Sequence, residues 1–512
     1  MLCGRGRSDA GQLPRTRDHR PRLRGRHLAD AGGRAVKRAL VAAAAALALI
    51  VPSGAKAFSP NDPLASRQWY LAQDKTFDAF DLLPLLPFVR VGVIDSGAEL
   101  SHPELRDRVV AARSFVGGHP DDIQGHGTFV AGEIAAAIDN GRGIAGLAPS
   151  ARLLIAKVVR NDGSVSPQAE AQAIRWVVAR GARVINVSLA GARDPQDGKN
   201  SGFSAVEQRA VDFATARGAL VVASVGNNPY PEAGAWHFAG YPAALPHVLG
   251  VGSFARDGDV STFSNRDDLY VDLAAPGEDM FSLLPRSMTL KNPGCVDQGY
   301  SSCGPKDYRH ASGTSFSAAQ ASAAAAMLFA LRPSLRPDQV SRILERSSDP
   351  ASPANGCSEC LAGRDAATGW GRLDFAAAIK DLRTGPLPVR DRFEPNDDIP
   401  LGKTLRKRSQ RMRATVDYWD DPTDVYRIHL RRGQRVRVVA QAGLDVDLSL
   451  ALWKPRLRTL VGASSSARLR RSVHPAGFPE RIVYRATKAG WYSLQVIATK
   501  PGSGSYALTV KR

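Results

Sequence analysis

Residues 90–97 read RVGVIDSG, a short apolar run that ends in a carboxylate and a turn. Short apolar runs of the same kind recur through the middle of the chain, and Ala-rich segments with a helical period separate them. The runs lack alternating polar residues, which is typical of parallel strands that are buried on both faces. This alternation of strands and helices predicts an α/β fold, a parallel sheet with helices on both of its faces.

The elements expected of this sheet follow one another from residue 90 onward. In such a sheet, functional groups gather at the carboxyl ends of the strands. We predict strands at Arg90–Ile94, Arg152–Val159, Arg183–Leu189, Ala219–Ser224 and Val248–Val251, and helices at Phe129–Ile138, Pro167–Arg180 and Ala205–Arg217.

Three polar motifs interrupt the apolar pattern. Asp95 ends the first run, His126 lies between two glycines at the start of a helix, and Ser315 precedes a helix of small residues at 316–331. Taken singly, each has an ordinary structural explanation: an Asx turn, an exposed histidine and a helix N-cap.

Together, the three residues make up the groups that amide hydrolysis requires. The reaction needs a nucleophile stronger than water, a base with a pKa near 7 and a group that orients the base. Ser315, His126 and Asp95 supply these roles, and their order along the chain is one of those found in serine hydrolases. The pattern indicates a serine-type hydrolase.

Residues from about 60 to 382 resemble the catalytic domain of the subtilisin-like serine peptidase family. The motifs that carry the resemblance are DSG at 95–97, HGT at 126–128 and GTS at 313–315, with support from GIAGLAP at 143–149 and NVSLA at 186–190. The resemblance implies an endopeptidase that works through an acyl-enzyme intermediate. In that reaction Ser315 attacks the scissile carbonyl, His126 transfers its proton to the leaving amine, and buried Asp95 orients the imidazole.

The resemblance also assigns an oxyanion hole and a substrate cleft. Asn227 and the backbone N–H of Ser315 are the expected oxyanion donors. An extended substrate is expected to pair with two strand edges, one of which includes Gly163 within 162–165. The other expected substrate-binding residues are Ser188, Leu189 and Ala190 on the opposite edge, and Gly226 and Gly240 in the pocket for the residue before the cut.

Catalysis of this kind requires no metal or other cofactor. A structural calcium ion is nevertheless an open expectation, because Glu104 stands where many relatives use Asp to bind calcium. Asp139 and Asn140 offer further oxygen ligands in the neighbouring loop, although calcium needs six or more.

The N-terminal segment has the features of an export signal. Lys37 and Arg38 precede the twelve apolar residues 40–51, and the sequence AKA follows at 55–57. This order is typical of a secretory signal peptide, assigned to residues 36–57, and its apolar run is too short to span a bilayer. We expect a secreted, extracellular protein without a membrane span in its mature form. Residues 1–35 are expected to be disordered, or to reflect a translation start placed too far upstream.

The cysteines fit an oxidising compartment. Of the five in the chain, Cys3 precedes the expected cleavage point, which leaves Cys295, Cys303, Cys357 and Cys360. Four cysteines in an exported chain predict disulfides, and of the three pairings the local one, Cys295–Cys303 with Cys357–Cys360, is our expectation. The same spacing is compatible with a zinc site.

A linker at 383–390 separates the peptidase-like domain, assigned to 58–382, from a C-terminal domain at 391–512. There the apolar pattern changes to a period of two, which predicts a small β-sandwich. The sequences FEPND at 393–397, DVY at 424–426, DVDL at 445–448 and GSGSY at 502–506 resemble the bacterial pre-peptidase C-terminal (PPC) domain, an accessory module of secreted proteases. Strands are expected at Val425–Leu430, Gln434–Ala440, Leu448–Trp453, Arg481–Ala486, Trp491–Ala498 and Ser505–Val510.

The net charge of +19 is concentrated at the two ends of the chain. Residues 391–512 hold 24 Lys and Arg against 11 Asp and Glu, a net charge of +13, whereas the central part is nearly neutral. This distribution gives no support to nucleic-acid binding by the main domain. The basic C-terminal domain either binds an anionic surface or polymer, or reflects an Arg-rich composition. Apart from that, we expect protein or peptide substrates and a monomer.

The leading functional hypothesis is a secreted serine endopeptidase of broad specificity. The alternative is a secreted binding protein on a peptidase fold that has lost its activity. The complete set of Asp95, His126, Ser315 and Asn227 argues against that alternative. An esterase with a G-x-S-x-G elbow is disfavoured because Ser315 lies in the sequence GTSFS.

Overall fold

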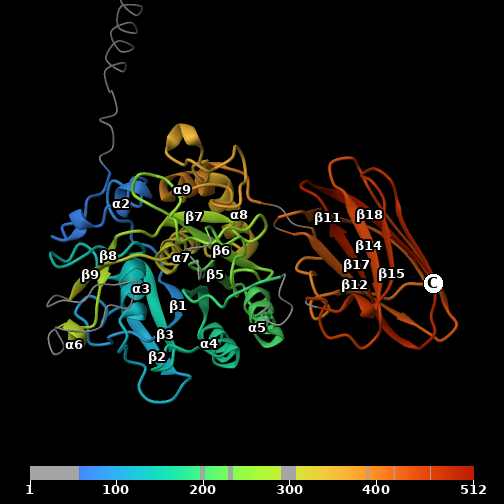
Figure 1. The fold of residues 1–512 in the computed structure, drawn as a ribbon, viewed down its shortest axis with the longest axis horizontal. Coiled ribbons are helices and arrows are strands. Elements are labelled where there is room, and N and C mark those ends of the chain that lie inside the picture. Colours follow the sequence, from blue (N-terminus) through green and yellow to red (C-terminus); the bar gives the residue numbers. More distant parts are fainter. Residues whose placement is uncertain are drawn as a thin grey trace, which may run out of the picture. The chain divides into compact units, whose positions relative to one another are not determined.

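The computed structural model describes residues 57–195, 202–228, 234–289, 307–388, 391–419, 421–461 and 463–512 (Figure 1). Residues 1–35, nearly all of the expected signal peptide, and both Cys295 and Cys303 lie outside these ranges. The described chain forms an α/β part followed by an all-β part.

The α/β part is built on a seven-stranded sheet in which every neighbouring pair is parallel. The strand order β2-β3-β1-β4-β5-β6-β7 puts β1 between β3 and β4. The predicted α/β fold with a parallel sheet is therefore confirmed. The strands are β1 (Val89–Asp95), β2 (Val109–Ser114), β3 (Ala151–Lys157), β4 (Ala182–Val187), β5 (Leu220–Ser224), β6 (Val248–Phe254) and β7 (Leu273–Pro276).

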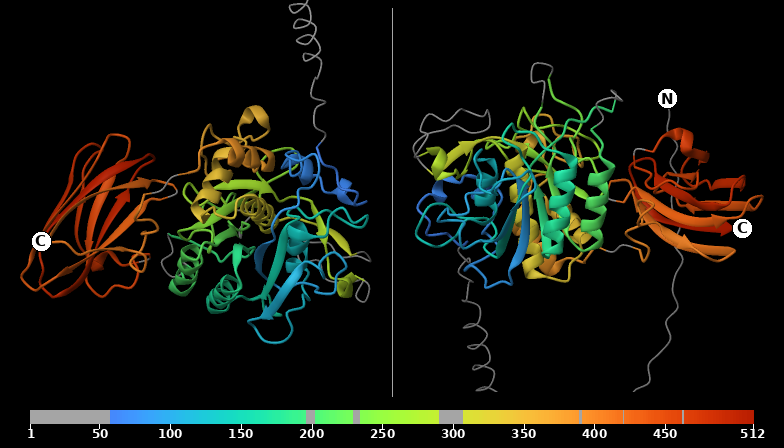
Figure 2. Two further views of the ribbon diagram at one scale, coloured as in Figure 1. Left: turned by 180° about the vertical axis from the view of Figure 1, so that it is seen from behind. Right: turned by 90° about the horizontal axis from the view of Figure 1, so that it is seen from below.

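Helices cover both faces of the sheet (Figures 1 and 2). On one face, α3 (His126–Ala135) and α7 (Thr314–Leu331) pack on alternate strand residues such as Val91 and Val93 of β1. On the other face, α4 (Pro167–Ala179) and α5 (Ala205–Ala216) pack on residues such as Ile94. The strands are buried on both sides, which is why their sequences are almost continuously apolar.

Two helix boundaries differ from the sequence-based expectation at the places that matter most. Helix α3 begins at His126, three residues before the expected start, and ends at Ala135. Helix α7 begins at Thr314 with Gly313 as its N-cap, so Ser315 lies inside the first turn and is not a capping residue. The polar residues at the starts of both helices can be part of the helix because other groups accept hydrogen bonds from the free backbone N–H groups there.

Helix α7 is buried along nearly its whole length and consists mostly of small residues. By length and composition it is apolar enough to cross a membrane, contrary to the expectation that no such run follows the signal peptide, but 89% of its most apolar window is buried inside the protein. A helix without a polar face is typical of a protein core.

The remaining elements of the α/β part surround this core. The short helices α2 (Tyr70–Gln73) and α6 (Arg286–Thr289), the hairpin β8 (Met280–Leu283) and β9 (Tyr308–Ala311), and the 3-10 turns Ala65–Arg67 and Pro353–Asn355 lie at its periphery. Helices α8 (Pro337–Ser347) and α9 (Phe375–Thr384) complete the core on the α7 side.

The all-β part consists of two sheets with one apolar core between them. All six expected strands are present, and β10, β11 and β15 were not expected from the alternating pattern. One sheet has the order β10-β12-β17-β14-β15 and the other β11-β18-β13-β16. The strands are β10 (Lys403–Leu405), β11 (Ser409–Asp417), β12 (Thr423–Leu430), β13 (Arg435–Ala442), β14 (Leu448–Trp453), β15 (Arg468–Val473), β16 (Glu480–Arg485), β17 (Gly490–Ala498) and β18 (Ser503–Lys511), with a 3-10 turn at Ser465–Ala467.

Two carboxyl groups, those of Asp74 and Glu133, are fully buried in the core on the α3 side. Neither has a hydrogen-bond partner among the described residues. Burial raises the pKa of Glu133 well above its usual value, and the charge of Asp74 raises it further. Burial likewise raises the pKa of Asp74, with a contribution from Asp374. Both groups therefore favour the protonated form more strongly in the folded protein than in the unfolded chain.

We predict that Glu133→Gln stabilises the protein at alkaline pH. A carboxyl with a raised folded-state pKa contributes stability that is fully present below its unfolded pKa, near 4, and is lost as the pH rises toward the folded pKa. The glutamine side chain does not titrate, so the variant does not lose this stability as the pH rises. Its free energy of unfolding is expected to exceed that of the wild type by at least about 1 kcal/mol near pH 8 and to match it near pH 4.

Urea unfolding at acidic, neutral and alkaline pH measures this difference. Asp78→Asn, at an exposed carboxylate close to Asp74 in sequence, serves as the control and is expected to follow the wild type. A stability difference between Glu133→Gln and the wild type that does not change with pH contradicts the prediction.

Candidate active site

Asp95 lies at the carboxyl end of β1, inside the sheet, and its side chain is fully buried. Its Oδ1 accepts a hydrogen bond of 2.7 Å from the backbone N–H of Ser96 and lies 2.8 Å from Nδ1 of His126. Its Oδ2 has no hydrogen-bond partner among the described residues. An ionised carboxylate in such a place is strongly destabilising unless it is paired, so Asp95 depends on the imidazole beside it.

The start of α3 brings His126 to this carboxylate. Gly125, the N-cap, has a φ of 94°, a left-handed conformation that glycine adopts without strain. Gly127 allows the helix to approach the end of β1, because a Cβ at this position would lie 2.1 Å from the backbone oxygen of Gly97. The glycines on both sides of His126 are therefore required by the geometry of the site.

Opposing effects act on the pKa of His126. Burial lowers it, whereas the charge of Asp95, the hydrogen bond to Asp95 and the charge of Asp122 raise it, and the net result is a pKa above the usual value. The imidazole is thus a stronger base than a free histidine. Because Nδ1 faces Asp95, the other ring nitrogen, Nε2, is the atom that can exchange a proton with a substrate or a nucleophile.

Asp122 holds the two halves of this arrangement together. One of its buried carboxylate oxygens accepts hydrogen bonds of 2.9 Å from the Ser96 hydroxyl and from the backbone N–H groups of Gln124 and Gly125. The other accepts from the backbone N–H of Thr128 at 2.9 Å and from its hydroxyl at 2.7 Å. A single carboxylate therefore satisfies the free N–H groups at the start of α3 and ties them to the end of β1.

Ser315 is fixed by a network that joins α7 to the end of β4. Its hydroxyl donates to the backbone oxygen of Ser188 at 3.0 Å, and the Ser188 hydroxyl donates to the backbone oxygen of Ser315 at 2.7 Å. Asn186 donates its side-chain N–H to the Ser188 hydroxyl at 2.8 Å, and Ser322 donates to Asn186 Oδ1 at 2.9 Å. These mostly buried bonds hold the first turn of α7 in a defined position.

Two hydrogen bonds to its oxygen atom fix the orientation of the side-chain amide of Asn227. Its Oδ1 accepts hydrogen bonds from the backbone N–H of Thr314 at 3.0 Å and from the Thr314 hydroxyl at 2.9 Å. Because both bonds use the oxygen, the Nδ2 end points away from Thr314. A Cβ at Gly313 would lie 3.3 Å from Nδ2, so a side chain there would crowd the amide.

One cavity of about 470 Å³ unites these residues. Most of the residues predicted from the sequence line it: Asp95, His126, Gly163, Ser188, Leu189, Ala190, Asn227 and Ser315. Ser96, Gln124, Val159, Asn161, Ser312, Gly313 and Phe316 complete the lining.

Gly226 and Gly240 were expected to line the pocket, but neither is among the residues that line this cavity. Both lie next to Ala190, which does line it. A Cβ at Gly226 would be 3.1 Å from the Ala190 Cβ, and a Cβ at Gly240 would be 3.2 Å from the same atom.

The segment that carries Asn227 has a neighbour at residues 263–266. Asn265 donates its backbone N–H to the backbone oxygen of Gly226 at 3.0 Å, and Asn228 donates to the backbone oxygen of Phe263 at 2.6 Å. Asn227 therefore lies between two backbone hydrogen bonds to the same neighbouring segment.

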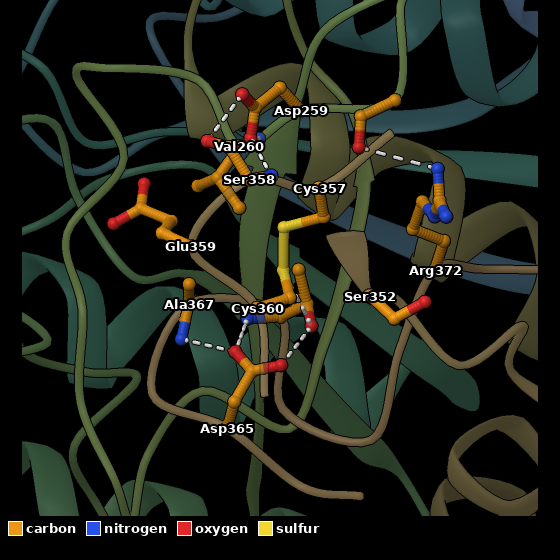
Figure 3. Close-up of a disulfide and its surroundings, with 12 residues drawn as sticks. Asp259, Val260, Ser352, Cys357, Ser358, Glu359, Cys360, Asp365, Ala367 and Arg372 are labelled. Carbon is orange, nitrogen blue, oxygen red and sulfur yellow. Dashed lines mark hydrogen bonds between the residues drawn. A yellow bond between two sulfur atoms is a disulfide. The ribbon is translucent and has the colours of Figure 1, made fainter. Parts of the chain in front are cut away.

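This neighbouring segment is anchored to a disulfide loop. Cys357 and Cys360 are buried and joined to each other, which is the local pairing expected for these two cysteines (Figure 3). Arg266, only 4% exposed, forms an ion pair with Glu359 inside the loop and donates to the backbone oxygen of Ser264. The loop is held in turn by Ser358, which donates its hydroxyl to Asp259 at 2.8 Å (Figure 3).

The residues considered for calcium are partly engaged in hydrogen bonds. Asn140 donates its side-chain N–H to Glu104 Oε2 at 3.2 Å, and its backbone N–H donates to Asp62 Oδ1 at 3.1 Å. The backbone N–H of Asp139 donates to Asp62 Oδ2 at 2.8 Å. Glu104 Oε1 is buried and has no hydrogen-bond partner among the described residues. Burial raises the pKa of the Glu104 carboxyl to about 7.

Comparison with known proteins identifies the family. Residues 88–371 match the model of the Subtilase family of peptidases. The chain belongs to the subtilase family. The subtilase is 35% identical over 235 residues to thermitase of Thermoactinomyces vulgaris. The aligned region covers 45% of this chain and 77% of thermitase. It is 34% identical over 254 residues to subtilisin DY of Bacillus licheniformis, which covers 49% of this chain and 80% of that protein.

Intracellular proteins are also among the relatives of this subtilase. The major intracellular serine protease of Bacillus subtilis is 38% identical over 204 residues, which covers 38% of this chain and 60% of that protein. The solved structure of a protease from Pseudoalteromonas arctica matches with a TM-score of 0.50 and 24% sequence identity. The match covers 64% of this chain and all of that chain, and it shows a similarity of fold. By its family and its relatives, this subtilase is a serine-type endopeptidase.

Three contributors to the site in this subtilase were not identified from the sequence. Asp122 precedes His126 by four residues, and an acidic residue just before a helix is a signal that favours a capping role. Thr314 was noted only as part of a motif. Arg266 has no local signal, because its partner Glu359 lies more than ninety residues away in sequence.

We predict that Asp122→Ala destabilises this subtilase by about 2–4 kcal/mol, because the substitution leaves several buried donors without an acceptor. Chemical denaturation of purified protein measures the loss. Asp122→Asn retains an acceptor oxygen at the same place and is expected to lose markedly less. Equal losses for the two variants would refute the assignment of Asp122 as a hydrogen-bond hub.

Proposed function

We propose that this subtilase is a secreted endopeptidase that hydrolyses peptide bonds through a triad of Asp95, His126 and Ser315. The observation that carries the proposal is the 2.8 Å contact between Asp95 Oδ1 and His126 Nδ1 beside a cavity that Ser315 also lines. In this reaction, Ser315 Oγ forms a bond to the scissile carbonyl carbon while its proton passes to His126 Nε2. The imidazolium then gives this proton to the leaving amine, and water hydrolyses the resulting ester by the reverse sequence.

The arrangement of each residue supports its role. Asp95 stabilises the tautomer with a proton on Nδ1 and the imidazolium that forms during attack. Because the pKa of His126 is raised, activity is expected to increase with pH until the imidazole is neutral. The Ser315 hydroxyl donates to Ser188 in the absence of substrate, and catalytic hydrogen bonds often form fully only when substrate is bound.

Asn227 Nδ2 and the backbone N–H of Ser315 are the proposed donors to the oxyanion. The two hydrogen bonds from Thr314 to Asn227 Oδ1 leave Nδ2 directed to the cavity side, which supports this role. Preorganised donors of this kind stabilise the negative charge that develops on the carbonyl oxygen. The Arg266–Glu359 pair then supports the oxyanion donor through the neighbouring segment at 263–266.

The substrate is proposed to lie extended along the edge formed by Ser188, Leu189 and Ala190, with Gly163 on the opposite edge. Backbone pairing with such edges is independent of sequence, which is consistent with broad specificity. Gly226 and Gly240 lie next to Ala190, at the side of the cavity proposed for the residue before the cut.

The remaining proposals concern the chain outside the catalytic residues. The signal-like sequence at 36–57 supports export, and the motifs in 391–512 support assignment of the β-sandwich to the PPC family. The reaction derived above uses no metal, so any bound calcium would have a structural role. The domain boundaries at 382 and 391 and a monomeric state are proposed on the same sequence grounds.

We expect a fluorophosphonate probe to label the purified protein at Ser315, because an activated serine attacks phosphorus as it attacks a carbonyl. Mass spectrometry of peptides from the labelled protein identifies the modified residue. Ser315→Ala is expected to be unlabelled and to lose peptide hydrolysis. An unlabelled, folded wild type would support the alternative of an inactive binding protein on a peptidase fold.

If the disulfide loop acts through Asn227, the effects of substitutions at Glu359 and Asn227 on kcat are coupled. Asn227→Ala is expected to lower kcat by about 10²–10³ with little change in KM, because the lost hydrogen bond forms in the transition state. Glu359→Gln is expected to lower kcat by roughly fivefold, through a small displacement of the oxyanion donor. In the Asn227→Ala background, Glu359→Gln is expected to have no further effect on kcat.

Asp381→Asn removes an ion pair with Arg346 that joins α8 and α9, and is the control. It is expected to leave kcat unchanged in both backgrounds. If Glu359→Gln lowers kcat by the same factor with and without Asn227, the loop does not act through the oxyanion donor.

A further inference from the structure

We propose that the outer face of the sheet β11-β18-β13-β16 binds a linear polymer that carries phosphate groups. This surface deepens the proposed function, because it supplies the partner of the basic C-terminal domain. It is defined by seven basic residues, which we name the Arg face: Arg411 and Arg413 on β11, Arg435 and Arg437 on β13, Arg481 and Arg485 on β16, and Lys511 at the end of β18.

Strand alternation places these residues on one side of the sheet. In β11, β13 and β16 the basic residues are exposed, and the apolar residues between them are buried in the core. Strand pairing brings the basic residues together across the sheet: Arg435 lies opposite Arg485, and Arg437 lies opposite Lys511. All four strands therefore contribute basic residues to the face, with Thr509 and Ala507 of β18 opposite Arg411 and Arg413 of β11.

The Arg face is not neutralised by the protein itself. Among the described residues, none of the seven basic side chains forms an ion pair, and only Arg485 has a hydrogen bond, to the backbone oxygen of Gly433. Five carboxylates of the same domain are instead gathered in two overlapping groups formed by Asp391, Glu394, Asp397, Asp421 and Asp424. One of them, Asp391, accepts a hydrogen bond from the backbone N–H of Thr415 on β11.

The opposite sheet of the domain has a different outer face. There Val425, Ala451 and Trp453 pack with Ile399 and Leu460 in a second, smaller apolar cluster. This cluster covers part of that face with the protein's own chain, whereas the Arg face is open to solvent. The Arg face, whose basic side chains are exposed and form no ion pairs with described residues, is therefore the stronger candidate for a binding surface.

The spacing and chemistry of the Arg face fit repeated phosphate groups. Residues two apart on a strand are separated by about 6.8 Å, and neighbouring strands by about 4.8 Å, so the cations form a regular array. A guanidinium binds phosphate oxygens through paired hydrogen bonds. The other outward residues of the sheet include Val439, Val483, Ala507 and Thr509 and offer no aromatic ring on which a base could stack. The array therefore favours a phosphate backbone over recognition of nucleic-acid bases.

The test uses the full chain with Ser315→Ala to prevent self-digestion, and long-chain inorganic polyphosphate as the probe. The Arg face variant combines Arg413→Gln, Arg435→Gln, Arg437→Gln and Arg481→Gln. The control combines Arg431→Gln, Arg432→Gln, Arg456→Gln and Arg458→Gln, which are exposed residues of loops in the same domain. Both variants lose four charges, so a difference between them reports position and not net charge.

We expect the Arg face variant to bind polyphosphate roughly 100-fold more weakly than the wild type at moderate salt, and the control less than about threefold more weakly. The slope of log K against log salt concentration is expected to fall by about 3 for the Arg face variant, because four phosphate contacts are lost. Equal weakening of both variants would overturn the proposal in favour of diffuse attraction.

Three further probes identify the source of the phosphate. Vesicles of anionic phospholipid, single-stranded DNA and dextran sulfate are compared with polyphosphate. Tighter binding of dextran sulfate than of polyphosphate would overturn the assignment to phosphate groups, and tighter binding of DNA would overturn the preference for a bare phosphate backbone over nucleic acid. Binding of vesicles alone would assign the face to a lipid surface instead. The Arg face variant with Ser315 intact is expected to hydrolyse small peptides at the wild-type rate, so a failure of the catalytic proposal remains distinguishable from a failure of this one.

Discussion

The architecture of the catalytic part depends on one buried contact, that between the Asp95 carboxylate and the His126 imidazole. A carboxylate inside a protein is stable only when donors or positive charge surround it. Here the end of a central strand, a helix that begins against it and the Asp122 carboxylate meet within hydrogen-bond distance. Gly127 is needed because no side chain fits between the helix and the strand end, and Gly125 because of its left-handed conformation. The electrostatic requirement of one acid thus determines the local backbone of three segments.

The fold and the centre of the site could be predicted from the sequence because their signals are local. Apolar runs without alternation predicted the parallel strands, and the period-two pattern predicted the C-terminal sandwich. Asp95, His126, Ser315 and Asn227 follow strand ends or begin helices, so the topology of a parallel sheet brings them to one edge. The edge strands β2 and β7 were missed because β2 is half exposed and β7 is only four residues long.

Features that depend on contacts distant in sequence could not be predicted. The pairing of Arg266 with Glu359 joins two loops that no pattern relates. Gly226 and Gly240 were expected in the pocket wall, yet only their neighbour Ala190 lines the cavity, and a proximity of this kind has no signature in a sequence. The Arg face needed the register of four strands. The charge of the domain was evident from composition, but its concentration on one side of a sheet was not.

Helix α7 has a consequence for how the enzyme fails when heated. Its small side chains let it lie close to the strands along its length, and Ser315, the proposed nucleophile, occupies its first turn beside a large buried core. Regions of this kind open only when the whole domain unfolds. Thermal inactivation is therefore tied to cooperative melting of the fold, and fraying of surface loops leaves the chemistry intact.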